Sequence, residues 1–270
     1  MRITVLVKQV PETSGVQMDP DTGTLVRKGD TAIVNPLDIY GIETALRLKE
    51  RYGAETCALS MGPPAAESAL REALAMGIDR AALATDRAFA GSDTWATANI
   101  LAGAVRALPE ADLIICGERA TDGDTGQVGP ELAAALDLPV ATYVRKVVAL
   151  DSGSITVERS TEHGLTTLKL RLPALITVLK ETGEPRLPTL DGKIRARSAE
   201  LVKLTQAELK LDGDRIGLNG SPTRVVKIFH PQVGRTCRMF PAERESQLAE
   251  ATGALCAFLR ERGFIGGGQA

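Results

Sequence analysis

Short apolar runs alternate with stretches of helical hydrophobic spacing along the first half of the chain. The runs have the length and composition of buried parallel strands, and they lie at residues 3–7, 55–60, 81–84 and 112–116. Apolar residues between and after these runs recur at helical spacing, which predicts helices over residues 36–52, 66–75, 92–108 and, after a glycine-rich loop, 130–136. Strands that alternate with helices in this way predict βαβ units, and therefore a doubly wound parallel sheet of the α/β class.

From residue 141 onward the pattern changes to alternating apolar and polar positions. Such runs, separated by the turns Asp151-Ser152-Gly153 and His163-Gly164, predict an antiparallel meander joined to one edge of the parallel sheet. The runs cover residues 143–150, 154–160, 165–172 and 174–179.

Beyond residue 189 the chain carries too little apolar surface to form a core of its own. Residues 190–197 are polar and basic without a core-forming period, and the elements predicted after them are a short helix at 204–211, a strand at 225–229 and an amphipathic helix at 241–263. We therefore predict an α/β domain with an antiparallel extension over residues 1–189, followed by a loop and C-terminal arm over residues 190–270 that wrap a partner.

A glycine-rich loop joins the strand at residues 112–116 to its following helix. It contains Gly117, Gly123, Gly126 and Gly129. Backbone N–H groups and the positive end of the helix dipole converge at such a turn and favour an anion. The pattern alone is equally compatible with a tight βα turn, because it matches neither GxGxxG nor GxxxxGK[ST].

The position of this loop in the predicted sheet favours a nucleotide. Ligands of parallel sheets bind at the carboxyl ends of the strands, where the strand order reverses. Three turns lie at these ends, namely Val7-Lys8-Gln9, Ser60-Met61-Gly62 and Gly117 to Gly129. We expect them to meet in space and to line one nucleotide site.

The composition of the chain argues against several classes of protein. The chain has 270 residues, a formal net charge of −2 and only 3% aromatic residues, which argues against nucleic-acid binding. No apolar run is long enough to span a membrane, and the run after Met1 reads as a strand instead of a signal peptide. The four cysteines lack metal-binding spacing, so we expect no metal site and a cytoplasmic protein.

Six segments in order make the chain resemble the β subunit of electron-transfer flavoproteins over nearly its whole length. They are VLVKQV, NPLD, SMGP, LREALAMGIDRA, ICGERATDGDTGQVGP and LRLPALITV with its EPRLPTL sequel. The resemblance implies an adenine-nucleotide-binding α/β fold and a heterodimer with an α subunit that carries its own FAD.

The resemblance leaves two cofactors open for the β subunit. In the mitochondrial type the site holds AMP as a structural ligand, whereas in the electron-bifurcating type it holds a second FAD that accepts hydride from NADH. The DGDTGQVGPE run, TYVRKV (Thr142 to Val147) and GLNGSPTRVVKIF (Gly217 to Phe229) are similar to the bifurcating type. Gly126 departs from the Ala of many of its members, a change that does not separate FAD from AMP. We expect FAD, with AMP as the alternative.

The resemblance also implies the residues that bind the cofactor. Backbone groups of the loop are expected at the phosphates, with side-chain help from Thr125 and Gln127. Asp122 and Asp124 would repel a phosphate, so they are expected to hold the loop, or the ribose in the case of Asp122. An alternative role for the pair Asp124 and Gln127 is a helix capping box. The full expected set is Val7, Lys8, Asn35, Pro36, Leu37, Asp38, Met61, Gly62, Gly117, Asp122, Gly123, Asp124, Thr125, Gly126, Gln127, Val128 and Gly129.

Two of these residues have structural alternatives. Asn35 is suited to capping the helix that Pro36 begins, and Lys8 at a strand end is suited to simple solvation as well as to a pyrophosphate. No side-chain nucleophile or general base is expected, since hydride and electron transfer belong to the flavin.

Residues 190–197 correspond to the loop by which this family docks on partner dehydrogenases. Leu190 would be the apolar anchor, surrounded by Lys193, Arg195 and Arg197; the alternative is a solvated charge run. The function implied is electron transfer from NADH to a dehydrogenase by flavin-based bifurcation, and NADH oxidation occurs only in the heterodimer or a larger complex. The alternatives are a non-bifurcating shuttle that holds AMP and a stand-alone adenine-nucleotide-binding regulator.

Overall fold

The computed structural model describes residues 1–12, 16–18, 25–27, 32–224, 237–240 and 243–265. The chain forms two compact units, Met1–Arg224 and Val225–Ala270. The first unit extends past residue 189 because later segments pack on its helices and sheet, as shown below.

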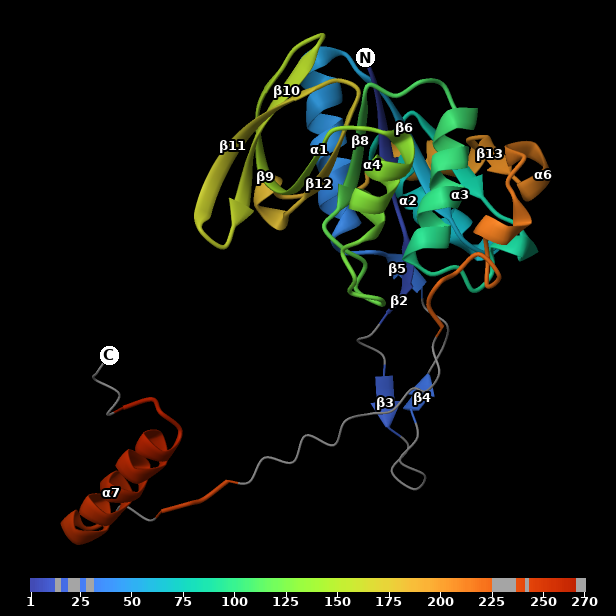
Figure 1. Cartoon of the computed structure of the whole chain (residues 1–270). Helices are drawn as coiled ribbons and strands as arrows, with labels where there is room; N and C mark the ends of the chain where they lie inside the picture. Colours follow the sequence, from blue (N-terminus) through green and yellow to red (C-terminus); the bar gives the residue numbers. More distant parts are fainter. Residues whose placement is uncertain (13–15, 19–24, 28–31, 225–236, 241–242, 266–270) are drawn as a thin grey trace. The chain divides into compact units, whose positions relative to one another are not determined.

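A nine-stranded sheet forms the centre of the first unit (Figure 1). Its strands, in spatial order, are β11 (Gly164–Arg171), β10 (Ser154–Thr161), β9 (Val140–Leu150), β12 (Ala174–Val178), β8 (Leu113–Gly117), β1 (Arg2–Leu6), β6 (Glu55–Met61), β7 (Arg80–Ala84) and β13 (Leu201–Leu204). From β9 to β13 every neighbouring pair is parallel, and β9, β10 and β11 pair antiparallel. The predicted doubly wound α/β sheet with an antiparallel extension is confirmed.

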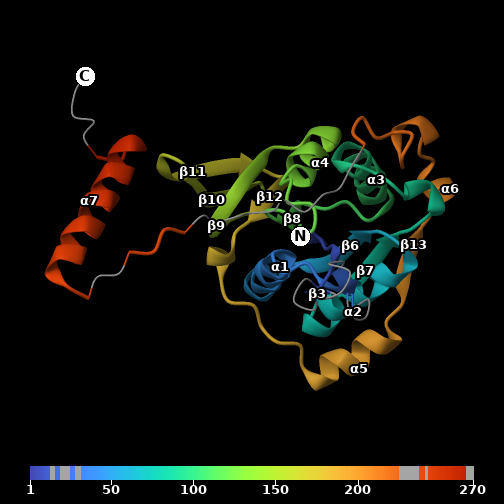
Figure 2. The same cartoon turned by 90° about the horizontal axis from the view of Figure 1, so that it is seen from below.

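Helices cover both faces of the parallel strands (Figure 2). Helices α1 (Asp38–Tyr52) and α2 (Glu67–Met76) lie on one face, and α3 (Thr94–Ala107) and α4 (Val128–Leu136) lie on the other. Strand β8 shows why an apolar run is needed here. Leu113 and Ile115 pack in the core on the α1 side, whereas Ile114 and Cys116 pack on the α3 and α4 side.

The strand order reverses between β1 and β8. The chain runs from β1 through α1 to β6 and through α2 to β7, and then returns along α3 to β8 on the other side of β1. The carboxyl ends of β1 and β8 therefore border the crevice in which doubly wound sheets hold their ligands.

Strand β12 differs from the prediction. It was expected as the last strand of the antiparallel meander, but it pairs parallel with both β8 and β9. All five of its residues are buried, and its uninterrupted apolar sequence suits a strand covered on both faces.

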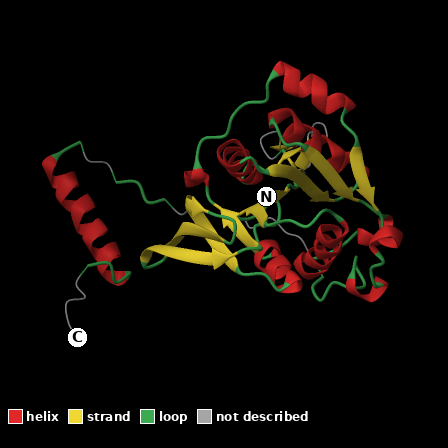
Figure 3. Cartoon of the chain, turned by 90° about the horizontal axis from the view of Figure 1, so that it is seen from above, coloured by secondary structure: helices red, strands yellow, loops and turns green. Residues whose placement is uncertain are grey.

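The segment after residue 189 also differs from the prediction. Residues expected to lack a regular period form helix α5 (Leu190–Ser198), which lies against α2, and β13 then pairs with β7. In Figure 3 this helix lies outside the sheet, and β13 forms the edge strand of the sheet. The expected short helix is α6 (Gln206–Leu209), and 3₁₀ turns occupy Pro64–Ala66, Arg87–Phe89, Lys180–Thr182 and Gly213–Arg215.

Two small antiparallel pairs follow β1. Strand β2 (Gln9–Pro11) pairs with β5 (Ala32–Val34), and β3 (Val16–Met18) pairs with β4 (Leu25–Arg27). Residues 19–24, which connect β3 to β4, lie outside the described residues.

The second unit contains helix α7 (Glu245–Glu261). The strand predicted at residues 225–229 lies outside the described residues. Leu248, Leu255 and Phe258 on α7 are all exposed.

Candidate functional site

The carboxyl ends of β1 and β8 are joined through the buried carboxylate of Asp38. The Lys8 backbone N–H donates to Asp38 Oδ2 at 2.8 Å, and the Asn35 side chain and Gly117 backbone also hydrogen-bond this carboxylate. Burial raises the pKa of Asp38 to about 7, against the lowering effect of these hydrogen bonds. Asp38 therefore ties the first strand, the NPLD segment and the glycine-rich loop together.

Asn35 holds the loop instead of capping α1. Its Nδ2 donates to Arg119 O at 2.9 Å, and its Oδ1 accepts from the Thr121 N–H at 3.2 Å. Helix α1 begins at Asp38 without a side-chain cap, so the capping alternative for Asn35 is wrong. Asn35 is fully buried, and its amide spans the gap between NPLD and the loop.

Two of the loop glycines are required by packing. A Cβ on Gly117 would lie 2.5 Å from Asp38 Oδ1 and 2.8 Å from Leu37 C, and one on Gly129 would lie 2.7 Å from Thr177 Cγ2. The absence of these side chains allows NPLD and β12 to approach the loop and α4 closely.

The other two loop glycines leave open space. A Cβ on Gly123 would meet nothing within 4 Å, and one on Gly126 would meet only Glu118 O at 3.5 Å and the Tyr143 hydroxyl at 3.9 Å. Gly126 has φ +65°, a conformation that favours glycine. This open part of the loop has room for an anion to approach the backbone.

Helix α4 begins next to that open part without a side-chain cap. Its N-cap is Gln127, whose side chain makes no cap hydrogen bond, and Asp124 pairs instead with Arg119 at 2.9 Å. The capping-box alternative for Asp124 and Gln127 is therefore wrong. The uncapped N–H groups at Val128 and Gly129 suit a phosphate.

Two ion pairs hold the acidic residues of the glycine-rich loop. Lys8 Nζ lies 2.8 Å from Asp122 Oδ1, and Arg119 pairs with Asp124 as above. Each acidic residue of the loop thus has a cation partner, in agreement with the loop-holding role expected for Asp122 and Asp124. Thr125 and Gln127 are exposed, so their side chains are available to a ligand.

The remaining predicted residues lie at the same edge of the sheet. Val7 is buried, and its N–H donates to Leu59 O at 2.9 Å. At the end of β6, Met61 is half-buried, and the Gly62 N–H donates to Ala84 O at 3.1 Å. Pro36 is exposed and Leu37 is half-buried.

Thr94, at the start of α3, was missed from the sequence. Its hydroxyl contacts Gln127 Oε1 at 3.4 Å and Glu131 Oε1 at 3.2 Å. Burial raises the pKa of Glu131, opposed by the Thr94 hydrogen bond, and Glu131 Oε2 is buried without a hydrogen-bond partner among the described residues. The signal available in the sequence was Ser92-Asp93, which starts a helix at the carboxyl end of another parallel strand.

The predicted docking residues lie on α5. Leu190 is 75% exposed and Ile194 is 58% exposed, while Lys193 and Arg197 are also exposed. Arg195 differs, because its guanidinium donates to Leu74 O at 3.2 Å, near the end of α2. The exposed surface of α5 is therefore apolar and mainly basic, with Asp191 as its acidic residue, and Arg195 contributes to holding the helix in place.

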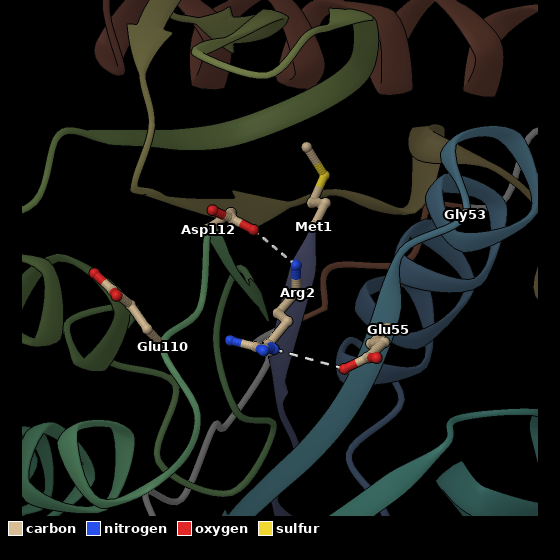
Figure 4. A pocket seen from close by; sticks show the side chains of 6 residues that line it. All are labelled: Met1, Arg2, Gly53, Glu55, Glu110 and Asp112. Carbon is tan, nitrogen blue, oxygen red and sulfur yellow. Dashed lines mark hydrogen bonds and ion pairs between the residues drawn. The ribbon is translucent and has the colours of Figure 1, made fainter.

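A pocket at the opposite end of the strands is unsuited to a phosphate. Met1, Arg2, Gly53, Glu55, Glu110 and Asp112 line it (Figure 4). Arg2 Nε lies 3.5 Å from Glu55 Oε2, and the Arg2 backbone N–H donates to Asp112 Oδ2 at 2.8 Å. Three carboxylates at the amino ends of the strands would repel an anionic ligand.

Further candidate chemistry is limited in the part of the chain that the structure describes. No group of three or more His, Cys, Asp or Glu side chains there is placed to hold a metal ion. Burial raises the pKa of Cys57 to about 11 and that of Cys116 further, which makes both thiols unreactive. Among the described residues no helix has the length and hydropathy of a membrane span.

The chain matches a known protein family and several named relatives. The profile of the family described as "Electron transfer flavoprotein domain" matches residues 22–209. The chain is 46% identical over 241 residues to electron transfer flavoprotein subunit beta of Thermoanaerobacterium thermosaccharolyticum, covering 89% of this chain and 92% of that protein.

Two further relatives cover similar lengths. Subunit CarD of the caffeyl-CoA reductase-Etf complex of Acetobacterium woodii is 40% identical over 98% of this chain and 100% of its own. Protein FixA of Azorhizobium caulinodans is 44% identical over 86% of this chain and 85% of its own.

Proposed function

Since the chain belongs to the electron transfer flavoprotein family and serves electron transfer as a β subunit, we propose that its loop site holds FAD and that it acts in a heterodimer with an FAD-containing α subunit. In this proposal the complex takes electrons from NADH and delivers them to a partner dehydrogenase by electron bifurcation. The proposed location is the cytoplasm, where the thiols of Cys57 and Cys116 stay reduced.

The observation that carries the proposal is the open loop beside the uncapped start of α4. The loop leaves space at Gly123 and Gly126, Thr125 and Gln127 are exposed, and α4 begins at Val128 without a side-chain cap. These features together suit the binding of an anion. These groups would hold the phosphates of FAD, and Lys8 and Asp122 would lie at its edge.

The flavin, when bound, supplies hydride acceptance and electron transfer. The residues of this chain would position it. Asp38 and Asn35 tie NPLD to the first strand and to the loop, and the backbone atoms of Val7 and Met61 would read the adenine edge. The non-bifurcating alternative uses the same phosphate surface for AMP.

Partner docking is proposed for the exposed surface of α5. Leu190 would insert into an apolar pocket of the dehydrogenase, and Lys193 and Arg197 would face acidic residues around it. The CarD relative, named as part of a reductase–Etf complex, supports an assembly of this kind.

The nucleotide content of the purified heterodimer tests the proposal. Two FAD per heterodimer, together with NADH-dependent reduction of a low-potential acceptor, is the expected result. One FAD plus one AMP would establish the non-bifurcating alternative. A stable monomer that binds ATP without flavin would instead support a nucleotide-binding regulator.

A further inference from the structure

Tyr143 has a backbone conformation that tyrosine rarely adopts. In the β9–β12 ladder Ala141 pairs with Ile176 and Val144 pairs with Val178, so Thr142 and Tyr143 oppose the single residue Thr177. This is a β-bulge, and Tyr143 has φ +57°, in the left-handed region. A bulky residue there is strained, whereas glycine would not be.

The bulge is locked to the start of α4. The Tyr143 N–H donates to Thr177 Oγ1 at 3.0 Å, and Thr177 is 2% exposed. The Thr177 methyl group in turn occupies the space that a Cβ on Gly129 would fill. The position of Tyr143 relative to the glycine-rich loop is thus determined by packed neighbours.

Core packing does not account for the tyrosine side chain. It is 45% exposed, and its hydroxyl makes no hydrogen bond to the residues that the structure describes. The same hydroxyl lies beside Gly126, 3.9 Å from the position of a Cβ there, in the open part of the loop. Strain of this kind persists where surrounding structure imposes it, and it is concentrated at functional sites.

We propose that the Tyr143 hydroxyl donates a hydrogen bond to a phosphate oxygen of the nucleotide held by residues 117–129. This inference rests on the proposed function, since it requires a phosphate in that loop. The phenol supplies an O–H donor beside Gly126, in the part of the loop that leads to the start of α4. The bulge on β9 directs the side chain to this place.

The first test removes only the hydroxyl. The nucleotide of the β subunit is removed from the heterodimer, and the FAD of the α subunit is retained. AMP, ADP and adenosine are then titrated separately into the wild-type and Tyr143→Phe heterodimers, and binding is measured by calorimetry. We expect AMP and ADP to bind the variant about tenfold more weakly, as for one hydrogen bond to a charged group, and adenosine to bind both proteins equally.

The second test separates ligand contact from structural support. Tyr143→Gly removes the side chain but relieves the strained φ, so we expect a higher melting temperature of the nucleotide-free heterodimer together with weaker AMP and ADP binding. Lys210→Gly is the matched control, because exposed Lys210 has φ +50° at the end of α6. It should raise the melting temperature and leave nucleotide affinity unchanged.

Unchanged AMP and ADP affinity in Tyr143→Phe would overturn the inference, as would an equal loss of affinity for adenosine. Wild-type heterodimer that binds none of AMP, ADP or FAD at the β site would refute the proposed function itself. Normal wild-type binding with no effect of Tyr143→Phe would refute only the role of Tyr143.

Discussion

At the residue scale, Asp38 links folding to protonation. Its carboxyl is buried, its pKa is raised to about 7 by that burial, and it joins β1, NPLD and Gly117. Between pH 3.8 and about 7 the folded chain therefore holds a proton that the unfolded chain has released.

The free energy of unfolding should fall as pH rises through this window. The largest slope for one such group is about 1.4 kcal/mol per pH unit. Asp38→Asn removes the titration while keeping an acceptor for the Lys8 N–H, so its stability should change less between pH 5 and 8. Urea unfolding at several pH values measures this, with Asp191→Asn on exposed α5 as the control. Parallel curves for wild type and Asp38→Asn would contradict the expectation.

Gly117 and Gly123 form a matched pair for testing why the loop contains glycine. Gly117→Ala places a Cβ 2.5 Å from Asp38 Oδ1, and we expect the free energy of unfolding to fall by about 1–3 kcal/mol. Gly123→Ala meets nothing within 4 Å and should change it by less than about 0.5 kcal/mol. Chemical denaturation of both variants decides the question, and equal losses would show that packing at Gly117 is unimportant.

The sequence predicts where the candidate site lies, but it predicts fewer of the contacts between the residues of that site. The glycine spacing and the strand ends predict the loop as the site, and the structure brings the predicted residues to one edge of the sheet. The glycine-rich pattern predicts phosphate approach at all four glycines, yet Gly117 and Gly129 are required by packing against Asp38 and Thr177, residues distant in sequence. The roles of Asn35 and Thr94 likewise depend on partners that only the folded chain brings near.

At the element scale, a charged cluster fixes the segment that leads to α5. Arg186 Nε lies 2.9 Å from Glu43 Oε2 and also pairs with Glu50, while Arg47 donates to Glu184 O at 3.0 Å. Glu43 is nearly buried on α1. Burial raises its pKa, but hydrogen bonds from Arg186 and Arg47 outweigh that effect and hold the pKa below its ordinary value.

Arg186→Gln should release this segment from α1. We expect the free energy of unfolding to fall by about 1–3 kcal/mol, less than for a fully buried pair because the arginine is one-third exposed and Arg47 still pairs with Glu43. Amide exchange of residues 183–189 should also accelerate. Glu50→Gln, which removes only the exposed partner, should have a much smaller effect. Protection unaltered by Arg186→Gln would show that the cluster does not hold the segment.

Most elements followed from the hydrophobic pattern, and the exceptions have physical causes. An apolar run such as residues 174–178 has no signal for parallel or antiparallel pairing, since that depends on which strands are already its neighbours. Helix α5 has little apolar periodicity because it buries only the small residues Gly192 and Ala196, and polar contacts also hold it on α2. Arg71 donates to Ala199 O at 2.6 Å and Arg195 donates to Leu74 O at 3.2 Å.

At the scale of the whole molecule, the second unit presents an apolar surface. Leu248, Leu255 and Phe258 are spaced to lie on one side of α7, and all three are about half exposed. An amphipathic helix of this kind is suited to packing against another chain, and we propose the α subunit as that chain.

Charge on that side of α7 should weaken the heterodimer. Leu255→Asp with Phe258→Asp places two carboxylates in the proposed interface, and we expect the dissociation constant for the α subunit to rise at least tenfold. Ala257→Asp, an exposed position on the opposite side of the helix, should leave it nearly unchanged. Sedimentation of mixed subunits measures both. Equal affinity in the double variant would place the interface elsewhere.

The position of β12 has a consequence for the order in which parts of the protein fold during synthesis. Strand β12 lies between β8 and β9, although both precede it along the chain. When the glycine-rich loop emerges from the ribosome, Thr177 has not yet been synthesised. Both Gly129 and Tyr143 contact Thr177 in the folded protein. During synthesis the free edge of β8 must stay unpaired until β12 emerges. The anion site is therefore completed late, and the unpaired edge of β8 is a defined place for a chaperone to bind.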